Sequence, residues 1–586
     1  MSVLSSLARA YDRLPDAPPS GFSSEKVGFC ISLNEDGSVA HVTDLRDTSG
    51  KKPVPRQMLV PHPVKRTAGI SPNTFWDKTS YVLGVTAGEG KRTQAEHAAF
   101  VEHHQALLSG TEDTGLKALL QFLGDWTPDR FSQLEWPEEM KDQNVIFALE
   151  DERLIHVYLH DRAAAQALWA AAGAAGDRSG QICLVSGRHG PVARLHPSIK
   201  GVWGAQSSGA ALVSFNLDAF TSYGHEQGDN APVSEDAAFR YTTALNRFLE
   251  KGSGHRLQIG DASTVFWADA SGLGGAAHQV EEMAEQLFAG YFDTDPAAEE
   301  ENAVKEIGIL LERIRKGDHL QDLGVQLDGE IRFFVLGLAP NAARLSVRFY
   351  FENSFGELTR HYQCFISDMR IDPPPRDGYP PLWRYLRETA VLGKGENVPP
   401  NLAGEWMRSI LSGGRYPLSL LSAVLTRLRA DGEINALRAG ILKANLVRNF
   451  NWEAPVALDT QNPDPAYVLG RLFAVLEKIQ LLALGKVNAT IRDRYFGAAS
   501  ATPRTVFPLL LKLNLHHRSK AEKNENTRKL ERFFSGQIAE IMNLLPTEFP
   551  KSLSLSDQGK FSIGYYHQFN YRKSEDTSSD AGEASQ

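Results

Sequence analysis

Three consecutive prolines, Pro373–Pro375, separate two stretches of different hydrophobic periodicity. Upstream, apolar and polar residues alternate, as in residues 331–352, and this period of two predicts β-strands. Downstream, apolar residues recur every three or four positions, which predicts amphipathic helices. We therefore expect an α+β protein with a mixed domain at 1–372, an all-helical bundle at 376–573 and a disordered polar tail at 574–586.

Two β-hairpins are predicted before the prolines. In residues 26–47, two apolar runs flank the turn pair Asp36-Gly37, and in residues 331–352 two runs flank Pro340-Asn341. The remaining predicted elements are strands at Tyr81–Gly84, 145–159 and 181–186, helices at Gln94–Leu108, Ala163–Ala175 and Glu235–Lys251, and a tight turn leading into a strand within Gly201–Phe220.

Two apolar stripes in the second half indicate the faces of packed helices. The first helix is predicted to begin at Asp464, a favourable N-cap followed by Pro465. Both stripes are expected to face the core of the bundle. Their members are Leu469, Leu472, Phe473, Leu476, Ile479 and Ala483 in one helix, and Leu530, Phe533, Phe534, Ile538 and Ile541 in another.

The chain of 586 residues has a formal net charge of −9, but its positive charge is concentrated in two zones. Residues 51–92 carry 8 Lys and Arg against 2 acidic residues, and residues 471–573 carry 17 against 8. Such zones are typical of surfaces that bind a polyanion, although a merely solvated basic face gives the same count.

Cysteine usage and hydropathy restrict the class of protein. Only Cys30, Cys183 and Cys364 occur, too dispersed for a disulfide framework or a thiolate zinc site. No stretch reaches about 18 uncharged apolar residues, and the start lacks an apolar signal segment. We expect a protein of the reducing cytoplasm that holds neither a cofactor nor a metal.

Catalytic motifs are nearly absent. Residues 204–209 read GAQSSG, but Ala210-Ala211 follow where a phosphate-binding loop requires Lys and then Ser or Thr. One alternative is a metal-dependent nuclease that uses His156, His160 and Asp161, which would need at least one more ligand within reach. Because GxSxG and HExxH are also missing, we expect a binding protein rather than an enzyme.

Several strings resemble the large subunit of the type I-C CRISPR Cascade complex. They are VPHPVKRTAGISPNTFWDKTSYVLG at 60–84, GAQSSGAALVSFNLDAFTSYGHEQGDNAPVSEDAAFRYTTALN at 204–246, YVLGRLFAVLEKIQ at 467–480 and GYYHQ at 564–568. The resemblance implies a noncatalytic subunit that recognises a protospacer-adjacent motif in duplex DNA and promotes R-loop formation. It also implies guidance of the non-target strand and recruitment of a helicase-nuclease for antiviral defence, while guide RNA reads the protospacer.

The residues themselves fit the implied contact with duplex DNA. A proline-rich loop supplies cations for phosphates and an amide for base edges, and Phe75 and Trp76 are either a wedge between strands or part of a core. A second polar set follows Gly204. The predicted motif-binding residues are Lys51, Lys52, Lys65, Arg66, Asn73, Lys78, Gln206, Ser207, Ser208 and Asn216.

The second basic zone is predicted to line a path for the displaced single strand. Its candidate residues are Arg492, Arg494, Arg504, Lys512, Arg518, Lys520, Arg528 and Arg532. Further partners implied by the resemblance are the backbone subunits with their crRNA and a small subunit made from an internal start in the same gene. No methionine immediately precedes Pro465, so we expect an alternative start codon near it.

Overall fold

The computed structural model describes most of the chain, in two compact units. The described residues are 2–15, 17–19, 21–50, 52–64, 66, 69–174, 181–292, 302–323, 331–376, 378–399, 401–485 and 487–571. Unit 1 comprises residues 1–197 and 213–244, and unit 2 comprises residues 198–212 and 245–586. Lys51, Lys65 and the predicted tail at 574–586 lie outside the described residues.

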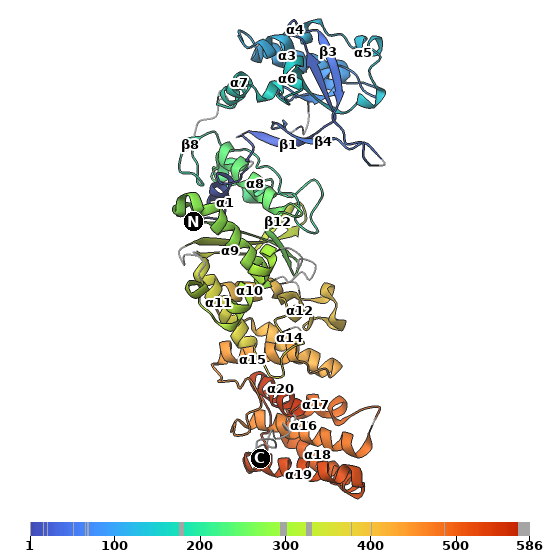
Figure 1. The fold of residues 1–586 in the computed structure, drawn as a ribbon, viewed down its shortest axis with the longest axis vertical. Helices are drawn as coiled ribbons and strands as arrows, with labels where there is room; N and C mark the ends of the chain where they lie inside the picture. Colours follow the sequence, from blue (N-terminus) through green and yellow to red (C-terminus); the bar gives the residue numbers. More distant parts are fainter. Residues whose placement is uncertain are drawn as a thin grey trace, which may run out of the picture. The chain divides into compact units, whose positions relative to one another are not determined.

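Unit 1 contains short strands and helices (Figure 1). They are α1 (Val3–Tyr11), β1 (Phe22–Val27), β2 (Phe29–Leu33), β3 (Val39–Asp44), β4 (Arg56–Pro61), β5 (Asp77–Lys78), α2 (Thr79–Val82), α3 (Thr93–Leu107), α4 (Thr114–Asp125), α5 (Arg130–Gln133), β6 (Asn144–Leu149), α6 (Glu150–Arg153), α7 (Ala163–Ala174), β7 (Gln181–Ile182), β8 (His189–Gly190) and the first part of α8 (Glu235–Leu249).

A four-stranded sheet with the order β3-β2-β6-β5 forms the centre of unit 1. Strand β2 pairs parallel with β6, and every residue of β2 is buried. Helices α3 and α4 pack on this sheet through Phe100 and Phe122, which share one apolar cluster with Phe147 of β6. The buried strands fix the position of the segment before β5, where the predicted DNA-binding loop lies.

Unit 2 begins as a sheet and continues as helices (Figure 1). Its elements are β9 (Arg256–Ile259), β10 (Ala262–Asp269), α9 (Ala277–Phe292), α10 (Asn302–Lys316), β11 (Arg332–Asn341), β12 (Arg344–Ser354), α11 (Phe355–Met369), α12 (Leu382–Arg387), α13 (Leu402–Ser412), α14 (Leu418–Asp431), α15 (Ala436–Phe450), α16 (Pro465–Leu484), α17 (Ile491–Ala501), α18 (Pro503–Lys523), α19 (Glu525–Asn543) and α20 (Leu555–Asn570).

One hydrophobic core extends through unit 2 from Leu257 of β9 to Tyr566 of α20. The antiparallel sheet has the order β12-β11-β10-β9, and the last strand ends at Ser354. The α+β class is therefore confirmed. The predicted boundary between 372 and 376 does not separate compact units, because side chains on both sides of it belong to this single core.

Both predicted hairpins are confirmed. In unit 1, β2 and β3 pair around a turn in which the Gly37 amide donates to the Asn34 carbonyl and the Ser38 amide donates to Asp36 Oδ1. In unit 2, β11 and β12 pair from Arg332↔Ser354 to Asn341↔Arg344. Turn chemistry gave the correct turn in the first hairpin. In the second, Pro340 and Asn341 are the last residues of β11, and the turn is Ala342-Ala343.

Four predicted elements were wrong in kind or in length. Tyr81–Gly84 lies at the end of the short helix α2, whose four residues are all buried and therefore carry no alternating signal. No strand follows the turn in Gly201–Phe220, where backbone pairing is limited to isolated bridges such as Ile199↔Ala210. The strand predicted at 145–159 ends at Leu149, and the one at 181–186 covers only two residues.

The helical predictions were mostly correct. Asp464 caps α16, since its Oδ1 accepts hydrogen bonds from the Ala466 and Tyr467 amides. The stripe in α16 is buried from Leu469 to Ile479. The stripe in α19 was only partly correct, because Leu530 and Phe533 are 48% and 37% exposed.

Candidate nucleic-acid interface

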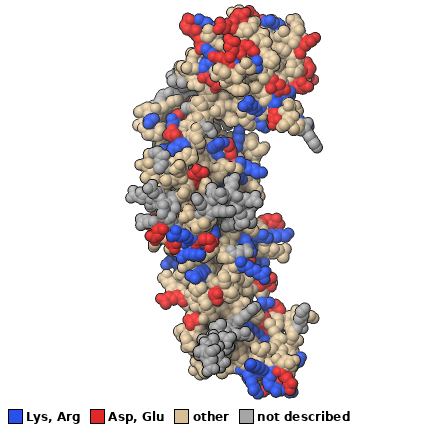
Figure 2. Space-filling model, viewed as in Figure 1, with Lys and Arg blue, Asp and Glu red and all other residues tan. Residues whose placement is uncertain are grey.

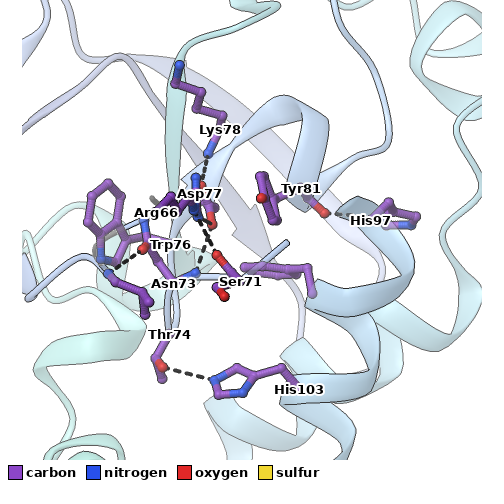
Figure 3. Close-up of polar contacts among 12 residues, drawn as sticks. Arg66, Ser71, Asn73, Thr74, Trp76, Asp77, Lys78, Tyr81, His97 and His103 are labelled. Atoms are coloured by element: carbon purple, nitrogen blue, oxygen red, sulfur yellow. Dashed lines mark hydrogen bonds and ion pairs between the residues drawn. The ribbon is translucent and has the colours of Figure 1, made fainter. Parts of the chain in front are cut away.

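The loop before β5 in unit 1 is organised by one buried carboxylate (Figure 3). Asp77 is 1% exposed. It accepts hydrogen bonds from the backbone amides of Asn73 and Lys78, each at 2.8 Å, and from the Arg66 guanidinium. Burial raises the pKa of Asp77 even though Arg66 opposes this effect. This ion pair and these amide bonds therefore join Arg66, Asn73 and Lys78 at one carboxylate.

Asn73 occupies a different place from the one predicted for a base-reading amide. Its side chain is 4% exposed, and its Oδ1 accepts a 3.0 Å hydrogen bond from the Val64 amide. In this conformation a base edge has no access to the amide. The sequence could not indicate this, because the burial results from packing between the loop and its neighbours.

Phe75 and Trp76 are core residues and not an exposed wedge. They are 1% and 3% exposed. Trp76 Nε1 donates to the Pro61 carbonyl at 2.8 Å, and the Phe75 amide donates to Nε2 of His104 at 2.9 Å. His104 is fully buried, and burial lowers its pKa to about 3, so its neutral imidazole accepts this bond at physiological pH.

Beside the loop lies a surface pocket of about 500 Å³ within unit 1. Its lining includes four cations from three segments, namely Arg66, Lys78, Lys91 and Arg92. The lining is completed by Gly69, Ser80, Tyr81, Thr86, Gly90, Thr93, Glu96 and Asp142. Four cations against two carboxylates leave the pocket positive, and its hydroxyl and amide groups add hydrogen-bonding capacity.

Each side of the pocket is held in position by specific contacts. Arg66 lies over the Tyr81 ring, with 4.0 Å between the guanidinium carbon and the ring centroid. Arg92 donates to the Gly69 carbonyl at 2.9 Å. Asp142 accepts a 2.6 Å bond from the Thr86 hydroxyl, so this carboxylate fixes the 86–92 loop. Arg66 and Arg92 are thus held in position before any ligand binds.

Lys91 and Arg92 were missing from the predicted site. Both were counted in the basic zone at 51–92, but nothing local in the sequence shows that they face the same pocket as Lys78. Lys91 forms an ion pair with Glu89 at 2.8 Å, and both side chains are at least 80% exposed. Such an exposed pair is weak, so Lys91 can exchange Glu89 for a phosphate at little cost.

The second polar set is divided between the two units. Gln206, Ser207 and Ser208 are exposed in unit 2 on a turn closed by a 2.9 Å bond from the Gly209 amide to the Gln206 carbonyl. Gly209 has φ +92, and a Cβ there would lie 2.9 Å from the Ile199 carbonyl oxygen. Asn216 is exposed in unit 1, as is Lys52.

The predicted basic path in unit 2 divides into paired and exposed residues. Arg492 lies 3.9 Å from Glu477, which is 1% exposed, and Arg518 bonds Glu531 at 3.0 Å. Arg504 pairs with Glu548 at 2.7 Å. Arg492 and Arg518 therefore neutralise buried carboxylates and are poor candidates for phosphate contact, whereas the Arg504–Glu548 pair is exposed and leaves Arg504 able to exchange its partner.

The other predicted residues of this path lie on the outer surfaces of the helices (Figure 2). Arg494, Lys512, Lys520, Arg528 and Arg532 are exposed. Lys523 of α18 and Lys529 of α19 are also exposed, and they were missing from the prediction. Figure 2 shows Lys and Arg gathered at the end of the bundle where α18 meets α19. This surface is a continuous candidate for backbone contact with a single strand.

The residues of the alternative metal site do not converge. His156 is exposed with φ +58, whereas His160 is 1% exposed and stacks on Tyr158 with 5.7 Å between ring centroids. His160 Nε2 is 3.7 Å from Asp161 Oδ1. Within the described ranges, no group of three or more His, Cys, Asp and Glu residues could hold a metal ion. The described geometry therefore gives the nuclease alternative no support.

A search for membrane-spanning helices in the described part of the chain found none of sufficient length and hydropathy.

Comparison with known proteins identifies the family. No curated protein matches the sequence. Residues 7–572, nearly the whole chain, match the family described as CRISPR-associated protein (Cas_Csd1). This match spans both compact units and includes the pocket and the basic helices described above. The chain therefore belongs to the Cas_Csd1 family of CRISPR-associated proteins.

Proposed function

We propose that this CRISPR-associated protein is the large subunit of a type I-C Cascade complex and reads the protospacer-adjacent motif in duplex DNA. The observation that carries the proposal is the pocket in unit 1, where Arg66, Lys78, Lys91 and Arg92 converge. Phosphate contacts of this kind set the register of a protein on DNA. Guide RNA would then read the protospacer by base pairing.

Two kinds of group can contact the motif, one at its phosphates and the other at its base edges. The cations of the pocket suit phosphates, whereas the Thr86 hydroxyl, which donates to Asp142, can accept a hydrogen bond from a base edge. The exposed amide of Gln206 in unit 2 is a second candidate for a base contact. Asn73 would act indirectly, since its bond to Val64 fixes the loop.

In this proposal the protein binds DNA and cleaves none. The exposed cations of α17, α18 and α19 would hold the displaced strand in a cytoplasmic complex, where a separate helicase-nuclease is recruited for antiviral defence. Support comes from α18 and α19, on which Lys512, Lys520, Arg528 and Arg532 are exposed. R-loop formation becomes more favourable if the protein compensates the unpaired strand's phosphates.

The experiment compares binding of the assembled complex to target duplexes that differ only in the adjacent motif. A variant with Lys78→Ala, Lys91→Ala and Arg92→Ala is expected to lose at least about tenfold in affinity for the motif-bearing duplex. Lys117→Ala is the control, because it removes an exposed cation of unit 1 that pairs with Glu112 at 2.5 Å, outside the pocket. Unchanged binding by the triple variant would reject the pocket as the DNA site.

We also propose a small subunit made from an internal start near Pro465. Residues of α16 and α20 form specific pairs, including Tyr467 with His567 at 2.9 Å and Arg471 with Gln568 at 3.0 Å, so this segment has an internal helix–helix core. Mass spectrometry of the purified complex tests this. A second product that begins near Pro465 supports the proposal, and its absence contradicts it.

A further inference from the structure

Residues 214–230 of unit 1 form an exposed loop that is held in one conformation by a single amide side chain. Asn230 Oδ1 accepts from the Ser222 amide at 2.9 Å, while its Nδ2 donates to the carbonyls of His225 at 3.2 Å and Gln227 at 3.0 Å. Each of these bonds joins parts of the loop that are separated in sequence. The loop therefore has a defined shape even though residues 216–226 are all exposed.

The base of the loop is fixed to the rest of unit 1. Gly228 is buried, its amide donates to the Arg194 carbonyl at 3.2 Å, and a Cβ on it would lie 2.0 Å from the Ala193 carbonyl oxygen. Only glycine can occupy this position without moving the backbone. The loop is thus seated directly on the 193–194 segment.

At its tip the loop directs a tyrosine into solvent at a conformational cost. Tyr223 is 97% exposed and has φ +53, in the left-handed region that glycine and asparagine adopt more readily. Leu217 and Phe220 on the same loop are 56% and 38% exposed. Burial in the fold does not explain an aromatic side chain that is exposed in this way, and exposed apolar groups with a strained backbone are typical of sites that bind another molecule.

The charge of the 214–230 loop indicates whether its partner is a nucleic acid or a protein. Between Lys200 and Arg240 the sequence has no Lys or Arg, while Asp218, Glu226 and Asp229 are exposed on the loop. Such a surface repels nucleic-acid phosphates. It suits a basic protein, and a subunit that holds guide RNA must be basic. Tyrosine is also frequent among the residues that dominate binding energy at protein interfaces.

We propose that residues 214–230 dock this protein onto a basic, guide-RNA-holding subunit of its CRISPR complex, with the Tyr223 ring inserted into an apolar notch of that partner. The inference rests on the proposed function, since it presupposes membership of such a complex. It adds the surface and the chemistry through which the protein joins the complex.

The test measures association of the full chain with the remaining subunits and guide RNA by native mass spectrometry and by titration. Tyr223→Ala is expected to weaken association by at least about tenfold, and Tyr223→Phe, which keeps the ring, by less than about threefold. Tyr223→Asn should weaken association as much as alanine without lowering the unfolding temperature, because asparagine accepts a positive φ. This variant separates docking from folding.

A second variant tests the charge argument. Combining Asp218→Asn, Glu226→Gln and Asp229→Asn should weaken association at low salt, with the difference from the parent protein vanishing near 1 M salt. Parental association by both Tyr223→Ala and Tyr223→Asn would overturn the proposal. Intact association with loss of DNA binding would also overturn it and would assign the loop to nucleic acid. If the pocket variants do not alter motif binding, the proposed function is rejected. The association measurements would still test whether the 214–230 loop docks onto a partner subunit.

Discussion

Gly470 of α16 faces Phe561 of α20 so closely that a Cβ on Gly470 would lie 1.9 Å from the Phe561 carbonyl oxygen. Gly564 has the reciprocal relationship with α16, because a Cβ there would lie 2.1 Å from the Tyr467 carbonyl oxygen. The backbones of α16 and α20 are thus in direct contact. At this contact the Tyr565 hydroxyl donates a 2.6 Å hydrogen bond to Glu477 Oε2. Both glycines lie in the strings that resemble the Cascade large subunit.

Gly470→Ala should destabilise unit 2 by about 3 kcal/mol or more, because the added methyl group meets backbone atoms that cannot rotate away. Gly564→Ala should have a similar effect. The control is Gly536→Ala in α19, where nothing lies within 4 Å of the new Cβ. That substitution should stabilise the protein by about 0.5–1 kcal/mol, since alanine favours helix over glycine. Denaturant unfolding followed by circular dichroism measures all three.

Removing the buried carboxylate Asp77 should disorganise the candidate DNA-binding loop. Asp77→Ala leaves Arg66 without its buried partner and deprives the Asn73 amide of its acceptor, at an expected cost of about 3–5 kcal/mol to unit 1. Hydrogen exchange of residues 69–78 should accelerate at the same time. Exchange at the parental rate would show that Asp77 does not hold the loop. Asp36→Ala, at the exposed turn of the β2–β3 hairpin, is the matched control.

Acid should destabilise unit 1 partly through His104. The pKa of this imidazole is about 3 in the folded protein and 6.5 as its ordinary value, so the unfolded chain binds the extra proton between these limits. Its contribution is therefore complete above pH 6.5 and is lost as the pH falls toward 3, by up to about 1.4 kcal/mol per pH unit.

A His104→Gln variant isolates this contribution from that of the other histidines. The difference in free energy of unfolding between parent and variant should shrink steadily from pH 6.5 to pH 4, because glutamine does not titrate there. Thermal or denaturant unfolding at several pH values gives this difference. A difference that is independent of pH would mean that His104 is not buried in its neutral form.

The basic helices should contribute to affinity for single strands and not to motif preference. Alanine at Lys512, Lys520, Arg528 and Arg532 should lower the slope of log affinity against log salt by about 0.7 per lost contact. Arg518→Ala should change the slope less than any one of these, because Arg518 already pairs with Glu531, whose side chain is 4% exposed. Equal slopes for the parent and the fourfold variant would exclude the path.

Sequence predicted what local chemistry determines. The Asp36-Gly37 turn and the Asp464 cap were correct because each involves neighbours within a few residues. Tyr81 was placed in a strand because burial on all sides removes the periodic signal. The buried position of Asn73 depends on the more distant Val64 amide, and no pattern in the sequence reports such a bond.

The candidate site shows the same limit. Arg492 and Arg494 are only two residues apart in α17. Arg492 faces the buried Glu477, whereas Arg494 faces solvent. The rotation of α17 about its axis relative to the bundle determines this difference. Lys91 and Arg92 line the pocket on a segment that begins at Thr86, and Thr86 is held by Asp142, 56 residues away in the sequence. Charge counts located two basic zones and could not show which of their side chains line one pocket or face solvent.

Site-specific photocrosslinking from the pocket tests the central claim most directly. A photoreactive amino acid in place of Lys91, in the complex assembled with guide RNA, should crosslink to nucleotides of the duplex within the motif next to the target. The same substitution at Lys117, outside the pocket, should give no such product. Crosslinks from position 91 only to guide RNA or to protein, with none to the motif, would contradict the account.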